Sequence, residues 1–296
     1  MPEPVTITAR DGWLLKGDLH EPSGSARGTV LAGHAMMANR RSLDRPPGEG
    51  LVATLVRGGL RVVTVDVRGH GESGPLPPEG GAYSYDDIVE KDIPAAVEFV
   101  RTRFPGKAAL LGHSLVGHAA LAWLSGPEAA GTGGLSAIAA YAPNAWLKSC
   151  EPDEKRWQAK LAQLRMWEQM SQAKGYFPAR QMKIGSDDVS GPYIRQFVQW
   201  ASEDRWVSLA GRDYRAGLAT LRIPLLVAVG AGDRMLCVPG CCERFLSPVP
   251  GERITWWLVS EAGGFGLDAD HMPLVTDARA RPLWERTADW LRDRLG

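Results

Sequence analysis

The sequence predicts an α/β protein, a mostly parallel sheet covered by helices on both faces. Three observations support this class. Short apolar or β-branched runs alternate with helical patterns up to residue 143, the alternation stops over residues 144–221, and it then resumes. Strands that alternate with helices usually pair in parallel, because each connecting helix packs back onto the sheet. We therefore expect a core domain of residues 1–143 and 222–296, with residues 144–221 as a helical cap inserted after the fourth parallel strand.

The first part of the chain contains the larger share of the predicted sheet. An alternating run, an Asp11-Gly12 turn and a second run predict an N-terminal hairpin. Apolar runs of strand length predict buried strands at residues 28–36, 107–114 and 135–143, and a β-branched run over residues 61–74 predicts another strand, ending in a Gly-rich loop. Helical periodicity appears at residues 50–59, 85–104 and 115–126. Pro94 lies inside the second of these helices, so we expect a kink there or a late start.

The predicted cap is rich in helical patterns and aromatic residues. Trp157, Leu161, Leu164 and Trp167 follow one another at spacings of four, three and three, which places them on one helical face of residues 153–174. A second helix is expected at residues 192–203. Core elements then return, as strands at 223–233 and 253–261 and helices at 241–247 and 281–295.

Composition excludes several classes of protein. Lys plus Arg and Asp plus Glu both number 34, and no basic stripe is visible, so nucleic acid is not an expected partner. The N-terminus is too polar for a signal peptide, and no run is long and apolar enough to span a membrane. Four cysteines without metal-ligand spacing are expected to be packed, reduced thiols in a cytoplasmic protein. We expect neither a metal nor another cofactor.

Ser114 is the strongest candidate for a catalytic group. It lies in "LLGHSLVGHA" (110–119), where a strand pattern ends and a helical pattern begins. A strand–turn–helix around Gly-x-Ser is typical of a nucleophile elbow, which exposes the serine at the carboxyl end of its strand. The motif departs from Gly-x-Ser-x-Gly, because Val116 replaces the second glycine. A buried serine that merely ends a strand is the alternative.

The chain resembles a serine hydrolase of the α/β-hydrolase fold over nearly its whole length. The resemblance rests on "GHAMMA" (33–38), "DVRGHGES" (66–73), "GHSLVG" (112–117), "GAGDRM" (230–235) and "GLDADHMPLV" (266–275). It implies a catalytic triad of Ser114, Asp233 and His271, in the family's chain order of serine, acid and histidine. Asp268 and Asp270 are alternatives to the acid, but both lie so close to His271 that they more plausibly shape its loop.

The same resemblance implies an oxyanion hole and assigns other motifs a structural role. Its two donors would be the backbone N–H groups of Met36 and Leu115. We interpret "DVRGHGES" as a brace for loops beneath the site. Val116 adds three carbons where the family has glycine, and overpacking costs about 1–3 kcal/mol unless neighbours shrink. The alanine-rich run 137–142 and Gly117 are the expected compensation.

These residues predict cleavage of a carboxylic ester of a small or medium, largely apolar substrate through an acyl-enzyme on Ser114. We expect His113, Trp167 and Trp200 to line the substrate pocket. Arg40 and Arg41 could bind a charged substrate, although a solvated pair is the simpler interpretation. Thioesterase, lactonase, peptidase, carbon–carbon hydrolase and acyltransferase reactions use the same triad, and a non-catalytic member that binds a small molecule is a further alternative.

Overall fold

The computed structural model describes residues 2–296 and confirms the α/β-hydrolase fold, with a mostly parallel sheet flanked by helices. Eight strands form one sheet in the order β1-β2-β4-β3-β5-β6-β9-β10. The N-terminal hairpin pairs antiparallel with β4, and every later neighbour is parallel. The strands are β1 (Glu3–Thr8), β2 (Leu14–His20), β3 (Thr29–Gly33), β4 (Arg61–Val65), β5 (Ala108–His113), β6 (Ala137–Tyr141), β9 (Leu225–Gly230) and β10 (Ile254–Val259).

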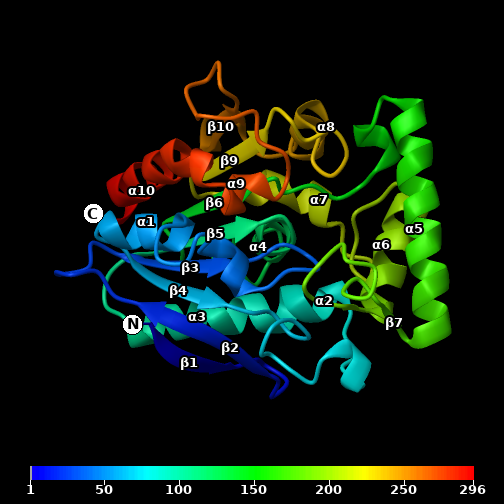
Figure 1. The fold of residues 1–296 in the computed structure, drawn as a ribbon, viewed down its shortest axis with the longest axis horizontal. Coiled ribbons are helices and arrows are strands. Elements are labelled where there is room, and N and C mark those ends of the chain that lie inside the picture. Colours follow the sequence, from blue (N-terminus) through cyan, green and yellow to red (C-terminus); the bar gives the residue numbers. More distant parts are fainter. Residues whose placement is uncertain (1) are drawn as a thin grey trace.

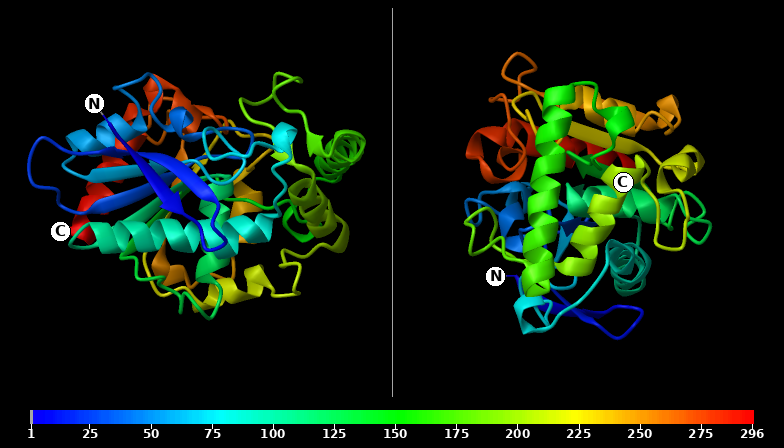
Figure 2. Two further views of the ribbon diagram at one scale, coloured as in Figure 1. Left: turned by 90° about the horizontal axis from the view of Figure 1, so that it is seen from below. Right: turned by 90° about the vertical axis from the view of Figure 1, so that its right-hand side faces the viewer.

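Helices cover both faces of this sheet (Figures 1 and 2). On one face lie α1 (Leu51–Arg57) and α10 (Arg281–Leu295), and on the other α3 (Ile93–Arg103) and α4 (Leu115–Leu124). Strands β3, β5, β6 and β9 are buried along their whole length, as expected for strands covered on both faces. The short helix α8 (Pro239–Phe245) follows β9, and α9 (Pro273–Thr276) precedes α10.

The helix predicted at residues 85–104 is divided into three parts. It starts with α2 (Tyr85–Asp87), continues through a π-helical turn at Ile88–Asp92, and becomes α3 at Ile93. Ser84 caps the start, since its hydroxyl oxygen accepts a hydrogen bond from the N–H of Asp87. Pro94 falls in the first turn of α3, directly after the π-helical turn.

The segment between β6 and β9 contains α5 (Glu154–Lys174), β7 (Tyr176–Phe177), β8 (Val189–Ser190), α6 (Gly191–Glu203) and α7 (Tyr214–Gly217). Helices α5 and α6 pack together beyond the carboxyl ends of the parallel strands (Figure 1). Gly175 ends α5 with φ of 81°, a left-handed conformation that favours glycine. Whether residues 144–221 form a cap that acts as a separate unit stays a prediction.

Candidate active site

Ser114 occupies a sharp turn between β5 and α4. Its backbone angles, φ 48° and ψ −105°, are strained for a residue with a side chain. The turn is held because the N–H of Ser114 donates to the carbonyl of Tyr141 on the neighbouring strand, at 2.8 Å. A Cβ on Gly112 would lie 2.4 Å from the backbone nitrogen of Gly117, so the close approach of strand and helix requires glycine at position 112.

Val116 is accommodated by a neighbour other than the expected one. Its side chain is buried and packs against Gly33, the last residue of β3. A Cβ on Gly33 would lie 2.4 Å from Val116 Cγ1, so the missing side chain on β3 makes the room for valine. The compensation expected from the sequence was the alanine-rich run 137–142 and Gly117, and the contact with Gly33 was not expected. Gly117 does provide close approach, against the carbonyl of Gly112.

Asp233 and His271 meet at the carboxyl edge of the sheet. His271 Nδ1 lies 2.8 Å from Asp233 Oδ2, and both residues are buried. The backbone N–H groups of Met235, Leu236 and Cys237 also donate to this carboxylate, at 3.2, 2.8 and 2.9 Å. Burial would raise the pKa of Asp233, but the hydrogen bond and charge of His271 and these N–H groups hold it below its usual value.

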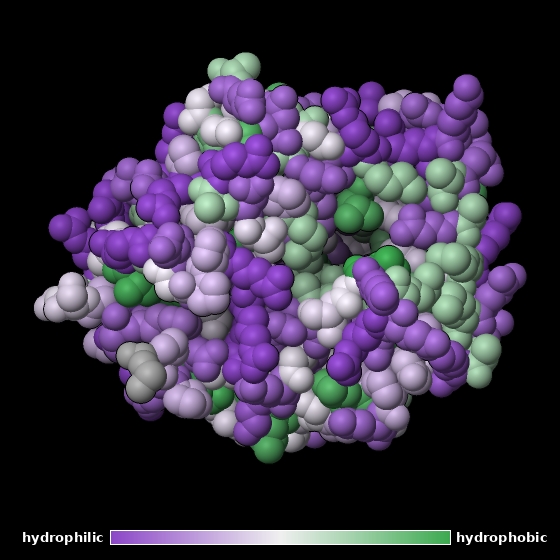
Figure 3. Space-filling view, viewed as in Figure 1, coloured by the Kyte–Doolittle hydropathy of each residue, from purple (hydrophilic) through white to green (hydrophobic). Residues whose placement is uncertain are grey.

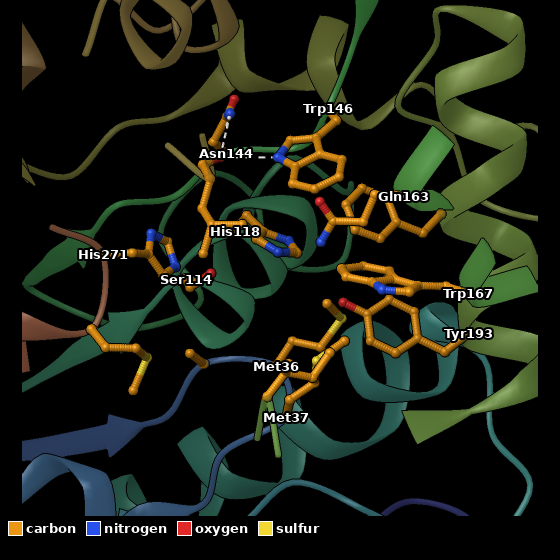
Figure 4. A pocket seen from close by; sticks show the side chains of 15 residues that line it. Met36, Met37, Ser114, His118, Asn144, Trp146, Gln163, Trp167, Tyr193 and His271 are labelled. Atoms are coloured by element: carbon orange, nitrogen blue, oxygen red, sulfur yellow. Dashed lines mark hydrogen bonds between the residues drawn. The ribbon is translucent and has the colours of Figure 1, made fainter. Parts of the chain in front are cut away.

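The hydrogen bond to a carboxylate fixes the orientation of the His271 ring. Because the carboxylate can only accept, Nδ1 carries a hydrogen, so in the neutral ring the lone pair lies on Nε2. Figure 4 shows the imidazole of His271 beside the hydroxyl of Ser114. His113 supports this loop from below, since its Nε2–H donates to the carbonyl of His271 at 3.1 Å. Burial and the nearby His271 hold the pKa of His113 well below its usual value, so its ring is neutral.

The loop after β3 brings Met36 to the same place. The N–H of Val67 donates to His34 Nε2 at 3.2 Å, and the carbonyl of His34 accepts from the N–H of Val116 at 3.2 Å, so this loop is tied to the elbow. Within residues 2–296, the N–H groups of Met36 and Leu115 have no hydrogen-bond acceptor. Leu115 is the first residue of α4, where the helix dipole adds to the positive potential.

Comparison with known families identifies the chain. Residues 47–258, well over half of its length, match the profile of the family described as "Serine aminopeptidase, S33". The chain belongs to this family. It is therefore an α/β hydrolase of the serine hydrolase type, which confirms the resemblance seen in its motifs.

Solved structures of esterases share the fold of this hydrolase at low identity. An esterase from Pyrococcus furiosus has a TM-score of 0.66 at 17% identity, covering 100% of this chain and 92% of that one. A thermophilic esterase from Thermogutta terrifontis, with malate bound, has a TM-score of 0.60 at 18% identity, covering 99% of this chain and 100% of that one. The esterase domain of a Rhodothermus marinus protein has a TM-score of 0.60 at 17% identity, covering 100% of both chains. Among curated proteins no significant match was found.

A cavity of about 260 Å³ opens at Ser114 and His271 of the hydrolase (Figure 4). Figure 3 shows a hollow with apolar residues at its rim, on the face where α5 and α6 approach the sheet. Met36 and Trp167 line the cavity, as the sequence analysis expected of Trp167. His113 and Trp200 do not line it. His113 lies beneath His271, and Trp200, a residue of α6, is buried with its indole N–H donating to the carbonyl of Val207 at 2.7 Å.

Several lining residues of the hydrolase were missed from the sequence. They come from the loop after β6, from α4, α5 and α6, and from the segment before β8: Asn144, Trp146, His118, Gln163, Tyr193, Phe197 and Ile184. Of these residues, only His118 could have been placed near the site from the sequence, because it follows Ser114 by one helical turn.

Arg40 is a structural residue and is not solvated. It is buried and forms ion pairs with Asp18, Asp66 and Glu72. Arg41 is exposed, and neither arginine lines the cavity at Ser114. Arg68 is likewise buried, against Asp92 and Asp11, so the "DVRGHGES" segment braces loops as its motif suggested. Over residues 2–296, no helix is long and apolar enough to cross a membrane.

Proposed function

We propose that this protein is an esterase that cleaves small, largely apolar carboxylic esters through an acyl-enzyme on Ser114. The hydrogen bond between His271 and Asp233 carries this proposal. It directs the basic nitrogen of His271 away from the carboxylate, on the side where Ser114 lies in its strained turn. Nucleophile, base and orienting acid then have the roles that a serine hydrolase requires.

The reaction follows from these positions. The Oγ of Ser114 attacks the ester carbonyl while His271 Nε2 takes its proton. The negative charge that develops on the carbonyl oxygen is stabilised by the N–H groups of Met36 and Leu115. His271 then protonates the leaving alcohol. Water, deprotonated by the same imidazole, attacks the acyl-enzyme and releases the acid, and the proton returns to Ser114.

The cavity lining favours a neutral ester over a peptide with a free amino terminus. No Asp, Glu, Lys or Arg is among the residues that line it. A buried ammonium group without a carboxylate partner would be costly, so a charged peptide end has no partner here. The volume of about 260 Å³ suits a short acyl or alcohol group. Three solved structures that share the fold are named as esterases, which agrees with this choice.

The first test is hydrolysis of p-nitrophenyl esters from acetate to dodecanoate, with Ser114→Ala beside the wild type. We expect activity on short and medium chains and a fall of about 10⁴-fold or more in kcat/KM for Ser114→Ala. Ser125→Ala is a matched control, because Ser125 follows α4 but bonds only the carbonyl of Ala122. A fluorophosphonate should add its mass to the wild type and to Ser125→Ala only. A wild type that neither hydrolyses esters nor takes up the label would contradict the proposal.

A further inference from the structure

His118 is a buried imidazole in the cavity that the proposed reaction does not use. It lies one helical turn after Ser114 on α4, it is 6% exposed, and it lines the same cavity. Because helical side chains tilt toward the N-terminus, its ring reaches back in the direction of Ser114. Figure 4 shows it between Ser114 and Gln163 of α5.

The tautomer of His118 is fixed by Tyr85. His118 Nδ1 lies 2.8 Å from the hydroxyl of Tyr85, and the indole N–H of Trp206, which can only donate, is the other group directed at that hydroxyl. Burial raises the pKa of Tyr85 well above its usual value, so the phenol keeps its proton. A buried hydroxyl needs an acceptor, so Tyr85 donates to Nδ1 and the hydrogen of the neutral ring lies on Nε2.

The Nε2–H of His118 is a donor without a partner. No acceptor for it is found in the described part of the chain, and Nδ1 carries the only hydrogen bond of the ring. Burial and the charge of His271 lower the pKa of His118 to about 3, so the imidazole is uncharged at neutral pH. The cavity therefore holds a fixed, neutral hydrogen-bond donor one helical turn after the serine.

We propose that the Nε2–H of His118 forms a subsite for a neutral oxygen acceptor in the substrate. The acceptor is a ketone, ether or hydroxyl oxygen within a few bonds of the scissile ester, so the preferred substrates are oxo- or alkoxy-substituted esters. This inference rests on the proposed esterase function and specifies its substrate class. Gln163, half-buried on α5, and Tyr193 on α6 contribute further polar side chains to the cavity lining.

A carboxylate is a poor occupant of this subsite. His118 is uncharged, and the lining offers no Lys or Arg to pair with a buried anion. An alkyl group is also penalised, because it would leave the Nε2–H desolvated without an acceptor. Sites built around a buried donor discriminate against analogues that cannot accept from it.

The test compares esters of matched shape. On the acyl side, ethyl 4-oxopentanoate is paired with ethyl 4-methylpentanoate, and on the alcohol side, 2-methoxyethyl butanoate is paired with butyl butanoate. We expect the wild type to prefer the oxygen-bearing ester of at least one pair by about tenfold in kcat/KM, with the difference mainly in KM. Equal kcat/KM within both pairs would overturn the subsite, even if all four esters are hydrolysed.

The decisive variant replaces both partners, as Tyr85→Phe with His118→Leu. Replacing His118 alone would strand the buried hydroxyl of Tyr85, whereas two apolar groups leave neither member of this hydrogen bond unpaired. We expect the ratio of kcat/KM between the two esters of each pair to fall to about 1. Since each ratio compares two substrates on one protein, a general loss of activity cancels. A preference that survives the double replacement would overturn the role of His118.

A binding measurement separates this inference from the proposed catalysis. Ser114→Ala is titrated calorimetrically with both esters of each pair, and the subsite predicts tighter binding of the oxygen-bearing one. If the wild type hydrolyses nothing but Ser114→Ala shows this preference, the esterase function fails and the subsite stands. If esters are hydrolysed and neither experiment shows a preference, the subsite alone fails.

Discussion

At the scale of single residues, Val116 and Gly33 form one packing unit. Valine in the elbow of a serine hydrolase adds bulk where the family has glycine, and the absent side chain of Gly33 on β3 makes room for it. Interiors are packed so closely that two such positions depend on each other. The turn at Ser114 is therefore formed with valine at position 116, without a glycine there.

Gly33→Ala is expected to destabilise the protein by about 1–3 kcal/mol, because the new Cβ would lie 2.4 Å from Val116 Cγ1. Adding Val116→Gly should relieve the clash, so the double variant is more stable than the sum of the single changes predicts. Urea unfolding measures all three free energies. Gly251→Ala is the control, since no atom lies within 4 Å of a Cβ there. Additive free energies would show that the two residues do not interact.

The sequence predicted the catalytic candidates better than their neighbours. Ser114, Asp233 and His271 follow strand patterns, and the carboxyl ends of parallel strands meet at one edge. The contact of Val116 with Gly33, and that of His118 with Tyr85, join segments far apart in the chain. Such pairs depend on how a helix is rotated against a sheet, which hydrophobic periodicity does not specify.

At the scale of elements, the loop after β3 is attached to the segment before β8. The carbonyl of Met37 accepts from the N–H groups of Ser186 and Asp187, at 2.8 and 3.3 Å. The carboxylate of Asp187 accepts from Asn39 Nδ2 and from the N–H of Gly71, each at 2.7 Å. Two loops of the sheet domain thus depend on one aspartate from the helical segment, and one of them carries the Met36 N–H.

Asp187→Ala should lower kcat for p-nitrophenyl esters by about tenfold with little change in KM, because the Met36 N–H acts on the transition state more than on the bound ester. The rate of fluorophosphonate labelling should fall in parallel. Asp289→Ala is the control, since Asp289 is exposed and pairs only with Arg292. A rise in KM alone would mean that Asp187 shapes the cavity and leaves the oxyanion loop in place.

At the scale of the whole molecule, a buried ion cluster holds the first turns of α5 (Glu154–Lys174) against the segment that leads into it. Glu151 accepts from Lys160 Nζ at 2.9 Å and from two nitrogens of Arg156 at 2.7 and 2.8 Å. Lys160, 1% exposed, also lies 5.3 Å from the ring centre of Trp146, which lines the cavity. Burial would raise the pKa of Glu151, but Arg156 and Lys160 lower it to about 2.

This cluster should make stability depend on acidity. A carboxyl group with a depressed folded pKa stabilises the protein above its unfolded value of about 4.3, and this contribution is lost as the pH falls toward 2. Glu151→Gln with Lys160→Met removes the fully buried pair and leaves Arg156, whose side chain is 23% exposed and can be solvated. We expect the free energy of unfolding of this double variant to fall less steeply between pH 4.5 and pH 2. The difference in slope from the wild type should correspond to at most one proton taken up on unfolding. Identical slopes would contradict this role.

The overall architecture could be predicted because alternation of strands and helices is a local pattern. The order of elements and the interruption after β6 both follow from it. The cavity could not be predicted in the same way. Its walls combine side chains from several segments, and a tryptophan stripe looks the same in sequence whether it lines a cavity, as Trp167 does, or fills a core, as Trp200 does.

The π-helical turn at Ile88–Asp92 affects how this protein tolerates insertions and deletions. A π turn contains one residue more than an α turn, so a regular α-helix over the same stretch would be one residue shorter. Deleting one residue there would convert the π turn into an α turn and leave the flanking segments close to their present directions. The same deletion within α3 would rotate everything before it by about 100°, and Tyr85 would turn away from His118 without any change in its identity. The π turn is therefore the place in this helix where one residue can be lost while the hydroxyl group stays on the imidazole.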